Sequence, residues 1–176
     1  MPTLPDPTIL AKLISNVTQT MCGTTFTPGD PLERGESLCG QMVMVPLKGE
    51  RNFTVVVASD QAGTRALASA LFGMAEGELT PELINDAIGE LLNMVSGQIS
   101  QMLQLNLHLG LPRPTTLGEL ISSGGDGIAD ATLFRSAGKV DLWLWVFENH
   151  PAPATAPAAQ KKSVFRSILK KLVPTT

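Results

Sequence analysis

The sequence predicts an α+β fold in which helices pack against an antiparallel sheet. Apolar residues recur at helical spacing in three stretches, and two further pairs of stretches rich in β-branched and aromatic residues are each joined by a short turn. The resulting order of helix, hairpin, helix, helix and hairpin is neither alternating βαβ nor all-helical. With 176 residues, 43% hydrophobic and 16% charged, the chain is expected to form one domain with a real core, which excludes disorder of the whole chain.

The first helix and the first hairpin are predicted from spacing and residue type. Residues 7–21 place apolar side chains three or four positions apart, and Pro7 suits a first helical turn. Residues 40–59 contain two stretches with β-branched and aromatic residues, GQMVMVPL and RNFTVVVAS, on either side of the turn at Lys48-Gly49-Glu50. Pro46 lies inside the first of these strands and indicates an edge position or a bulge.

Two helices are expected next. Asp60 is a suitable N-cap for a helix through Phe72, and Gly73 is a suitable stop. A longer helix begins at Thr80-Pro81-Glu82, where Thr80 can cap, Pro81 fits the first position and Glu82 complements the helix dipole. We expect this helix to run to about Leu105, which is ~39 Å at 1.5 Å per residue.

The remainder of the chain completes the sheet and adds a tail. Residues 110–114 are expected to be irregular or extended, and the glycine-rich residues 124–127 a turn without the ligand spacing of a calcium loop. A last hairpin joins strand 131–135 to strand 139–147 through the turn at 136–138. The predicted domain therefore covers residues 1–150, followed by a Pro/Ala linker at 151–160 and a basic amphipathic helix at 161–176.

Charge and composition exclude several classes of function. Residues 1–160 carry eight basic and sixteen acidic side chains, a net charge of −8, which argues against nucleic-acid binding. His108 and His150 are far apart, and Cys22 and Cys39 form no CxxC pair, so no metal site is expected; the cysteines are expected to be reduced and to fill core space, and His108 to be a surface residue. No apolar run approaches the ~20 residues of a membrane span, and the first residues lack the pattern of a signal peptide. We expect a cytoplasmic protein.

The basic tail leaves two interpretations open. Residues 161–173 carry five of the thirteen basic side chains and no acid, with an apolar stripe on the opposite side. Such a helix can lie on an anionic membrane surface or dock on an acidic protein surface. Docking on protein is the favoured interpretation.

The long helix carries the candidate chemistry. One face is apolar, and the opposite stripe is polar or glycine; this stripe consists of Asp86, Gly89, Glu90, Asn93, Gly97, Ser100, Gln101 and Gln104. Glu90 and Asn93 are three residues apart and point the same way. Gly89 and Gly97 each cost about 1 kcal/mol relative to alanine in a helix interior, which suggests close approach by another backbone or protein. The alternative is an ordinary solvated face.

These residues resemble a known family. The stretch Asp86-Ala-Ile-Gly-Glu90-Leu-Leu-Asn93-Met-Val-Ser-Gly97 resembles the ExxN helix of the CheC/CheX/FliY phosphatases of bacterial chemotaxis. Residues 40–73 and 112–118 are similar to the segments that flank that helix, so the likeness covers roughly residues 7–148. The resemblance implies a CheX-like fold and hydrolysis of the phospho-aspartate on a CheY-like receiver domain.

The resemblance also implies roles for individual residues. Asn93 would orient the attacking water, since a neutral carboxamide binds water without adding negative charge beside the phosphoryl group. Glu90 would pair with the receiver's lysine and fix the docking, while Asp86, Gly89 and Gly97 would contact the partner. No cofactor of this chain's own is implied; Mg²⁺ is expected on the phosphorylated receiver.

One departure from the family's pattern affects the expected assembly. CheC-like members carry a second ExxN in the first helix, whereas residues 7–21 contain no glutamate, so this chain resembles single-site CheX. That subfamily implies a homodimer built by joining two sheets. The last strand, residues 140–147, has two largely apolar faces, which fits either such a dimer or an ordinary central strand.

Two other functions remain open from the residues. A receiver-binding adaptor without turnover would keep the docking face, although the Glu90/Asn93 pair favours the enzyme. A membrane-recruited scaffold would instead work through residues 161–176.

Overall fold

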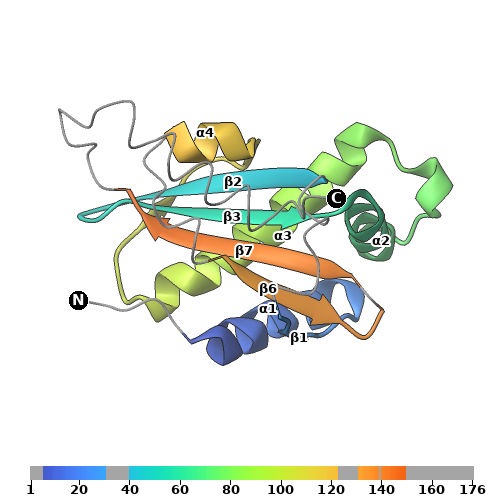
Figure 1. The fold of residues 1–176 in the computed structure, drawn as a ribbon, viewed down its shortest axis with the longest axis horizontal. Helices are drawn as coiled ribbons and strands as arrows, with labels where there is room; N and C mark the ends of the chain where they lie inside the picture. Colours follow the sequence, from blue (N-terminus) through green and yellow to red (C-terminus); the bar gives the residue numbers. More distant parts are fainter. Residues whose placement is uncertain (1–5, 31–39, 123–130, 139, 150–176) are drawn as a thin grey trace, which may run out of the picture.

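The computed structural model describes residues 6–30, 40–122, 131–138 and 140–149. Within these residues seven strands form one antiparallel sheet, in the order β1-β6-β7-β3-β2-β4, with β5 also paired to β2 (Figure 1). The strands are β1 (Phe26–Pro28), β2 (Gln41–Lys48), β3 (Phe53–Ser59), β4 (His108–Leu109), β5 (Arg113–Pro114), β6 (Thr132–Ser136) and β7 (Asp141–Glu148). The helices are α1 (Pro7–Cys22), α2 (Gln61–Phe72), the 3₁₀ turn η3 (Glu76–Glu78), α3 (Pro81–Met102) and α4 (Leu117–Ser122). The predicted α+β class is confirmed.

Local capping signals set the start of α1 and both ends of α2, and those of α2 were predicted. The Asp6 carboxylate accepts from the Thr8 N–H at 2.7 Å at the start of α1, and Asp60 accepts from the Gly63 N–H at 2.6 Å at the start of α2. The α2 helix ends at Gly73, whose φ of 63° is in the left-handed region that favours glycine.

The long helix α3 begins as predicted and ends earlier. Thr80 caps it by accepting from the Leu83 N–H at 3.3 Å, with Pro81 at the first position. It ends at Met102 rather than near Leu105, because Gln104 adopts a φ of 53° and turns the chain back toward the sheet. The reversal lets β4 and β5 lie along the sheet edge beside β2.

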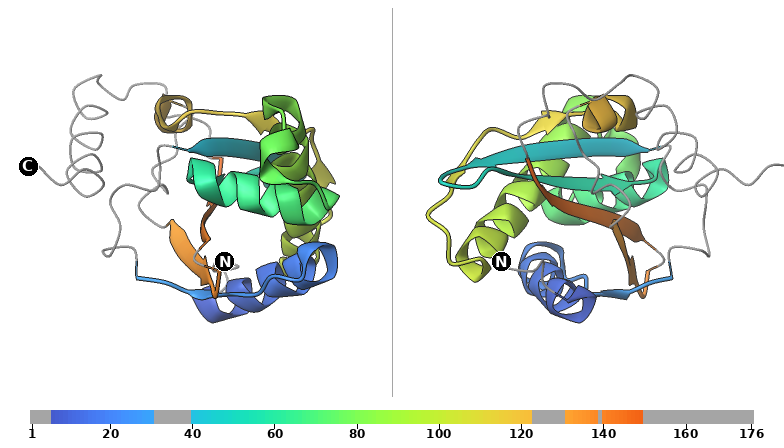
Figure 2. Two further views of the ribbon diagram at one scale, coloured as in Figure 1. Left: turned by 90° about the vertical axis from the view of Figure 1, so that its right-hand side faces the viewer. Right: turned by 60° about the vertical axis from the view of Figure 1, so that its left-hand side comes forward.

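The sheet is apolar on both faces. The helices α1, α2 and α3 cover one face, where Val45, Val55 and Leu144 are fully buried (Figure 2). The opposite face contains Trp143 and Trp145, whose rings stack with centroids 6.2 Å apart. Among the described helices, α4 packs on this second face through its leucines.

The last hairpin differs from the prediction in the bounds of its strands, and its position in the sheet explains the two apolar faces of its second strand. The strands are Thr132–Ser136 and Asp141–Glu148, each shifted by one or two residues from the expected bounds. β7 is a central strand, hydrogen-bonded to β6 and β3, and its residues are buried on both faces within one chain. Its two apolar faces therefore have an explanation that needs no second copy, and the homodimer stays a prediction.

The structure describes some of the remaining predicted features and not others. Cys39, residues 124–127, the linker and the tail are outside the described residues. Cys22 is partly buried against the core, with its thiol directed at the Thr18 carbonyl 3.2 Å away. His108 is exposed on β4, as expected of a surface residue. None of the described helices is long and apolar enough to cross a membrane.

Candidate functional site

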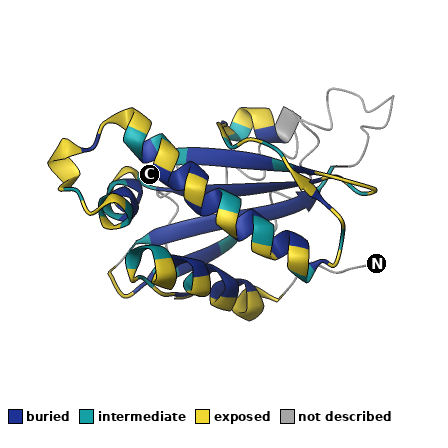
Figure 3. Ribbon diagram, turned by 180° about the vertical axis from the view of Figure 1, so that it is seen from behind, coloured by how far each residue is buried: buried dark blue, intermediate teal, exposed yellow. Residues whose placement is uncertain are grey.

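The outward face of α3 presents the residues that the sequence singled out. Asp86 and Glu90 are exposed, and Asn93 and Gly97 are half-buried. Figure 3 shows exposed and intermediate residues along the outward side of this helix. Side chains three or four residues apart on a helix lie about 5–6 Å apart at their Cβ atoms. The structure therefore places the Glu90 carboxylate and the Asn93 carboxamide as neighbours on a surface, where another protein can reach both.

Glu90 and Asn93 make no hydrogen bond or ion pair with any other side chain in the described part of the molecule. Asn85, on the side of α3 toward the sheet edge, behaves differently, because its side-chain oxygen accepts a hydrogen bond from Gln41 on β2. Asn85 therefore connects α3 to the sheet through a hydrogen bond. Asn93, eight residues later on the same helix, has no side-chain partner in the described part of the chain.

The scaffold beneath this face is rigid. Leu92, Val95 and Ile99 on the inner side of α3 have no exposed surface and pack into the core formed with α1, α2 and the sheet. At the first turn, hydrogen bonds from its own backbone N–H and from Thr80 lower the pKa of Glu82 from its ordinary value. Packing and a charged first turn therefore hold the Glu90/Asn93 pair on a fixed helix.

The two glycines of the predicted stripe have different environments. A Cβ at Gly97 would meet no atom within 4 Å, so nothing inside the described chain requires glycine there. Gly89 is buried, and a Cβ there would lie 3.3 Å from Cβ of Pro112. Pro112 belongs to the edge segment, residues 108–114, which contains β4 and β5. Gly89 thus lies beneath this segment rather than on the open face, and the backbone that approaches it closely belongs to the same chain. Ser100, predicted on the polar face, is also buried, because the edge segment covers that side of α3.

Exposed apolar side chains flank this face, and the sequence analysis gave them no role. Met94, the residue after Asn93, is 38% exposed, and Leu111, on the edge segment between β4 and β5, is 85% exposed. The exposure of Leu111 depends on how the edge pairs with β2, which no local pattern reveals.

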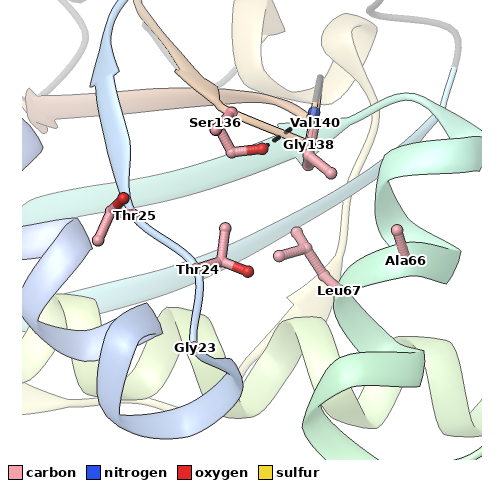
Figure 4. A pocket seen from close by; sticks show the side chains of 9 residues that line it. Gly23, Thr24, Thr25, Ala66, Leu67, Ser136, Gly138 and Val140 are labelled. Carbon is pink, nitrogen blue, oxygen red and sulfur yellow. Dashed lines mark hydrogen bonds between the residues drawn. The ribbon is translucent and has the colours of Figure 1, made fainter.

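A pocket of about 320 Å³ lies away from α3 (Figure 4). It is bounded by the loop after α1, by α2 and by the turn between β6 and β7, where the Ser136 hydroxyl accepts from the Val140 N–H at 3.1 Å. Hydroxyls, small side chains and one leucine line it, with no acid or base among them. This hollow carries no group for proton or phosphoryl transfer, whereas a carboxylate and a carboxamide lie on the outward face of α3. A helix face suits a protein substrate better than a small molecule, which binds in a concave site.

The described residues contain no group of three or more His, Cys, Asp or Glu side chains that could hold a metal ion. The carboxylates Asp86 and Glu90 on α3 stand apart from any such cluster.

Comparisons with known proteins match this fold and this segment. The family model of the chemotaxis phosphatase CheX matches residues 42–126, from β2 through α3 and α4. This match supports the CheC/CheX/FliY family for this chain. The structure of the chemotaxis protein CheX from Vibrio vulnificus is similar over 81% of this chain and 93% of its own, with a TM-score of 0.60 and 17% identity.

Two further members with solved structures share the fold. CheX of Borrelia burgdorferi, solved in a complex with CheY, BeF₃ and Mg²⁺, covers 84% of this chain and 100% of its own at a TM-score of 0.60 and 15% identity. A CheC-like protein from a Shewanella species covers 78% and 94% at a TM-score of 0.55 and 14% identity. No curated protein sequence matches this chain. The shared fold places α3 over one face of the sheet, and in this chain Glu90 is exposed on that helix and Asn93 is half-buried.

Proposed function

We propose that this protein is a CheX-like phosphatase that hydrolyses the phospho-aspartate of a CheY-like receiver domain. The observation that carries the proposal is the Glu90/Asn93 pair, held outward on a rigid helix with no partner inside the described chain. The family and the Borrelia CheX–CheY complex support it.

Asn93 is the catalytic residue in this proposal. Its carboxamide holds a water in line with the bond between phosphorus and the aspartate oxygen. The water oxygen attacks phosphorus and forms the new P–O bond, the P–O bond to the aspartate breaks, and the products are the free aspartate carboxylate and dihydrogen phosphate, which carries both hydrogens of the water. Positioning and electrostatics supply most of the catalysis in phosphoryl transfer, so the protein need not provide a nucleophile.

Glu90 has a docking role. Its exposed carboxylate lies one turn before Asn93 and would pair with the lysine of the receiver site, which fixes the distance between the carboxamide and the phosphoryl group. The acid at Asp86, one further turn toward the helix start, extends the negative strip and favours a basic partner surface.

Mg²⁺ enters with the receiver in this account. The ion would neutralise the charge that develops on the phosphoryl oxygens, and this chain's residues contribute orientation of water and docking.

Phosphate release from receivers of the source organism tests the proposal. Each CheY-like receiver is charged with acetyl phosphate, and release is followed with and without the protein. Faster release with one or more receivers supports the phosphatase and identifies its substrate. Binding that depends on phosphorylation without faster release would contradict the phosphatase and favour the adaptor, and the absence of both would contradict either function.

A further inference from the structure

The sheet edge beside α3 contains a β-bulge. β4 and β5 both pair antiparallel with β2, but in registers that differ by one residue. Leu47 pairs with Leu109, a register that would place Met44 opposite Pro112; Met44 instead pairs with Arg113. The edge therefore holds one extra residue between its two short strands. Bulges at sheet edges re-aim side chains and are frequent beside functional sites.

Pro46 and Gly110 fix the bulge. Pro46 has no N–H to donate to the ladder, and its carbonyl accepts the Gly110 N–H at 2.8 Å. A Cβ at Gly110 would lie 2.6 Å from Cγ of Pro46, so only glycine fits against the proline ring. Downstream, the Thr115 N–H donates to the Met42 carbonyl at 2.9 Å. The bulged segment is thus anchored at both ends.

The bulge places Leu111 beside the Glu90/Asn93 face. Pro112 lies over Gly89, the residue before Glu90. The edge segment follows α3 in the sequence and runs back along it toward the start of the helix. Because Pro112 lies over Gly89, the residue before Pro112 lies toward the C-terminal end of α3, the direction in which Asn93 follows Gly89. Leu111 is 85% exposed there.

Several exposed apolar side chains belong to α3 and the edge segment. Five large ones stand out among the described residues, and three of them are on α3 or the edge segment: Met94, Leu109 and Leu111. Exposed apolar surface with polar residues around it is typical of protein interaction sites. The backbone under Leu111 is already ordered, so a partner would not have to order it on binding.

We propose that Leu111 is an apolar anchor for the receiver domain, and that Met94, on the other side of Glu90 and Asn93, contributes to the same contact. This inference rests on the proposed function, because it names the partner of that same face. The partner at Leu111 is inferred to be the same receiver domain, because a protein that covers Leu111 also covers the neighbouring helix turn with Glu90 and Asn93. In this arrangement the bulge supplies affinity and α3 supplies the chemistry.

The variant Leu111→Ala tests the anchor, and Ile9→Ala on α1 is its matched control, since Ile9 is also a large exposed apolar residue. Binding of the BeF₃- and Mg²⁺-loaded receiver is measured for the full-length proteins by calorimetry, together with KM and kcat for phosphate release. We expect Leu111→Ala to weaken binding and raise KM about tenfold, a typical loss at a well-packed contact, with kcat within about twofold of wild type. Ile9→Ala should change neither, and both variants should keep the wild-type melting temperature.

Three outcomes would overturn the inference in distinguishable ways. Wild-type binding and KM in Leu111→Ala would remove the anchor and leave the proposed function intact. A lower molar mass of Leu111→Ala than of the wild type in light scattering would indicate that the bulge contacts a second copy of this chain. Failure of the wild-type protein to bind any loaded receiver would overturn the inference and the proposed function together.

Discussion

Gly97 and Gly89 are chemically identical residues with different reasons to be glycine. Gly97 faces open space, and nothing in the described chain requires glycine there, whereas Gly89 makes room for Pro112. Sequence spacing alone placed both on one partner face, because a helical projection cannot show which stripe the chain's own edge segment covers.

The substitution Gly97→Ala separates stability from binding. Removing a glycine from an unobstructed helix interior should stabilise the protein by about 0.5–1 kcal/mol, measured by urea denaturation. The same variant should bind the loaded receiver more weakly, because the added methyl group projects into the proposed interface.

Gly89→Ala is the matched control for that prediction. Its methyl group would lie 3.3 Å from Cβ of Pro112, so the edge segment must shift and the gain in stability should be smaller than for Gly97→Ala, or reversed. Equal stabilisation by both substitutions, with unchanged receiver binding in Gly97→Ala, would contradict the distinction drawn between the two sites.

At the scale of elements, local signals predicted the starts of helices well. Asp60, Thr80 and Gly73 are short-range capping signals, and each has the predicted position in the structure. The end of α3, the bulge at Pro46 and the central position of β7 depend on pairing between distant segments. The sequence indicated an edge or bulge at Pro46 without showing that the result would expose Leu111 beside α3.

The first turn of α3 is expected to contribute to the stability of the folded state in a way that depends on pH. The backbone N–H and the Thr80 hydroxyl lower the pKa of Glu82, so its carboxylate stabilises the folded state above the unfolded pKa, and this stability is lost as pH falls through the folded pKa. Glu82→Gln should therefore melt below wild type at pH 7, and the difference should shrink as pH falls below 4.5. A difference in melting temperature that is constant from pH 7 to pH 3 would contradict this origin.

At the scale of the whole molecule, an acidic body is joined to a basic tail. Residues 1–160 carry a net charge of −8, and all five charges of residues 161–173 are positive. The sequence favours docking of this tail on protein over attachment to a membrane. Because the tail is outside the described residues, its contact surface stays a prediction, as does the homodimer.

Sedimentation with vesicles that contain anionic phosphatidylglycerol tests the tail. We expect the full chain and a variant that lacks residues 161–176 to remain in the supernatant alike at physiological salt. Pelleting of the full chain that is lost on truncation would instead favour the membrane-recruited scaffold.

The most direct test of the central claim is single-turnover phosphate release by wild type, Asn93→Ala and Asn93→Asp, each with a receiver whose loaded form the wild type binds. Misplacement of the attacking water should lower the rate about 100-fold in Asn93→Ala, while its affinity for the BeF₃-loaded receiver stays within about twofold of wild type. Asn93→Asp keeps the shape but adds negative charge beside the phosphoryl oxygens, so it should also lose turnover. Release at the wild-type rate by Asn93→Ala would contradict the assignment of Asn93 as the residue that orients the water.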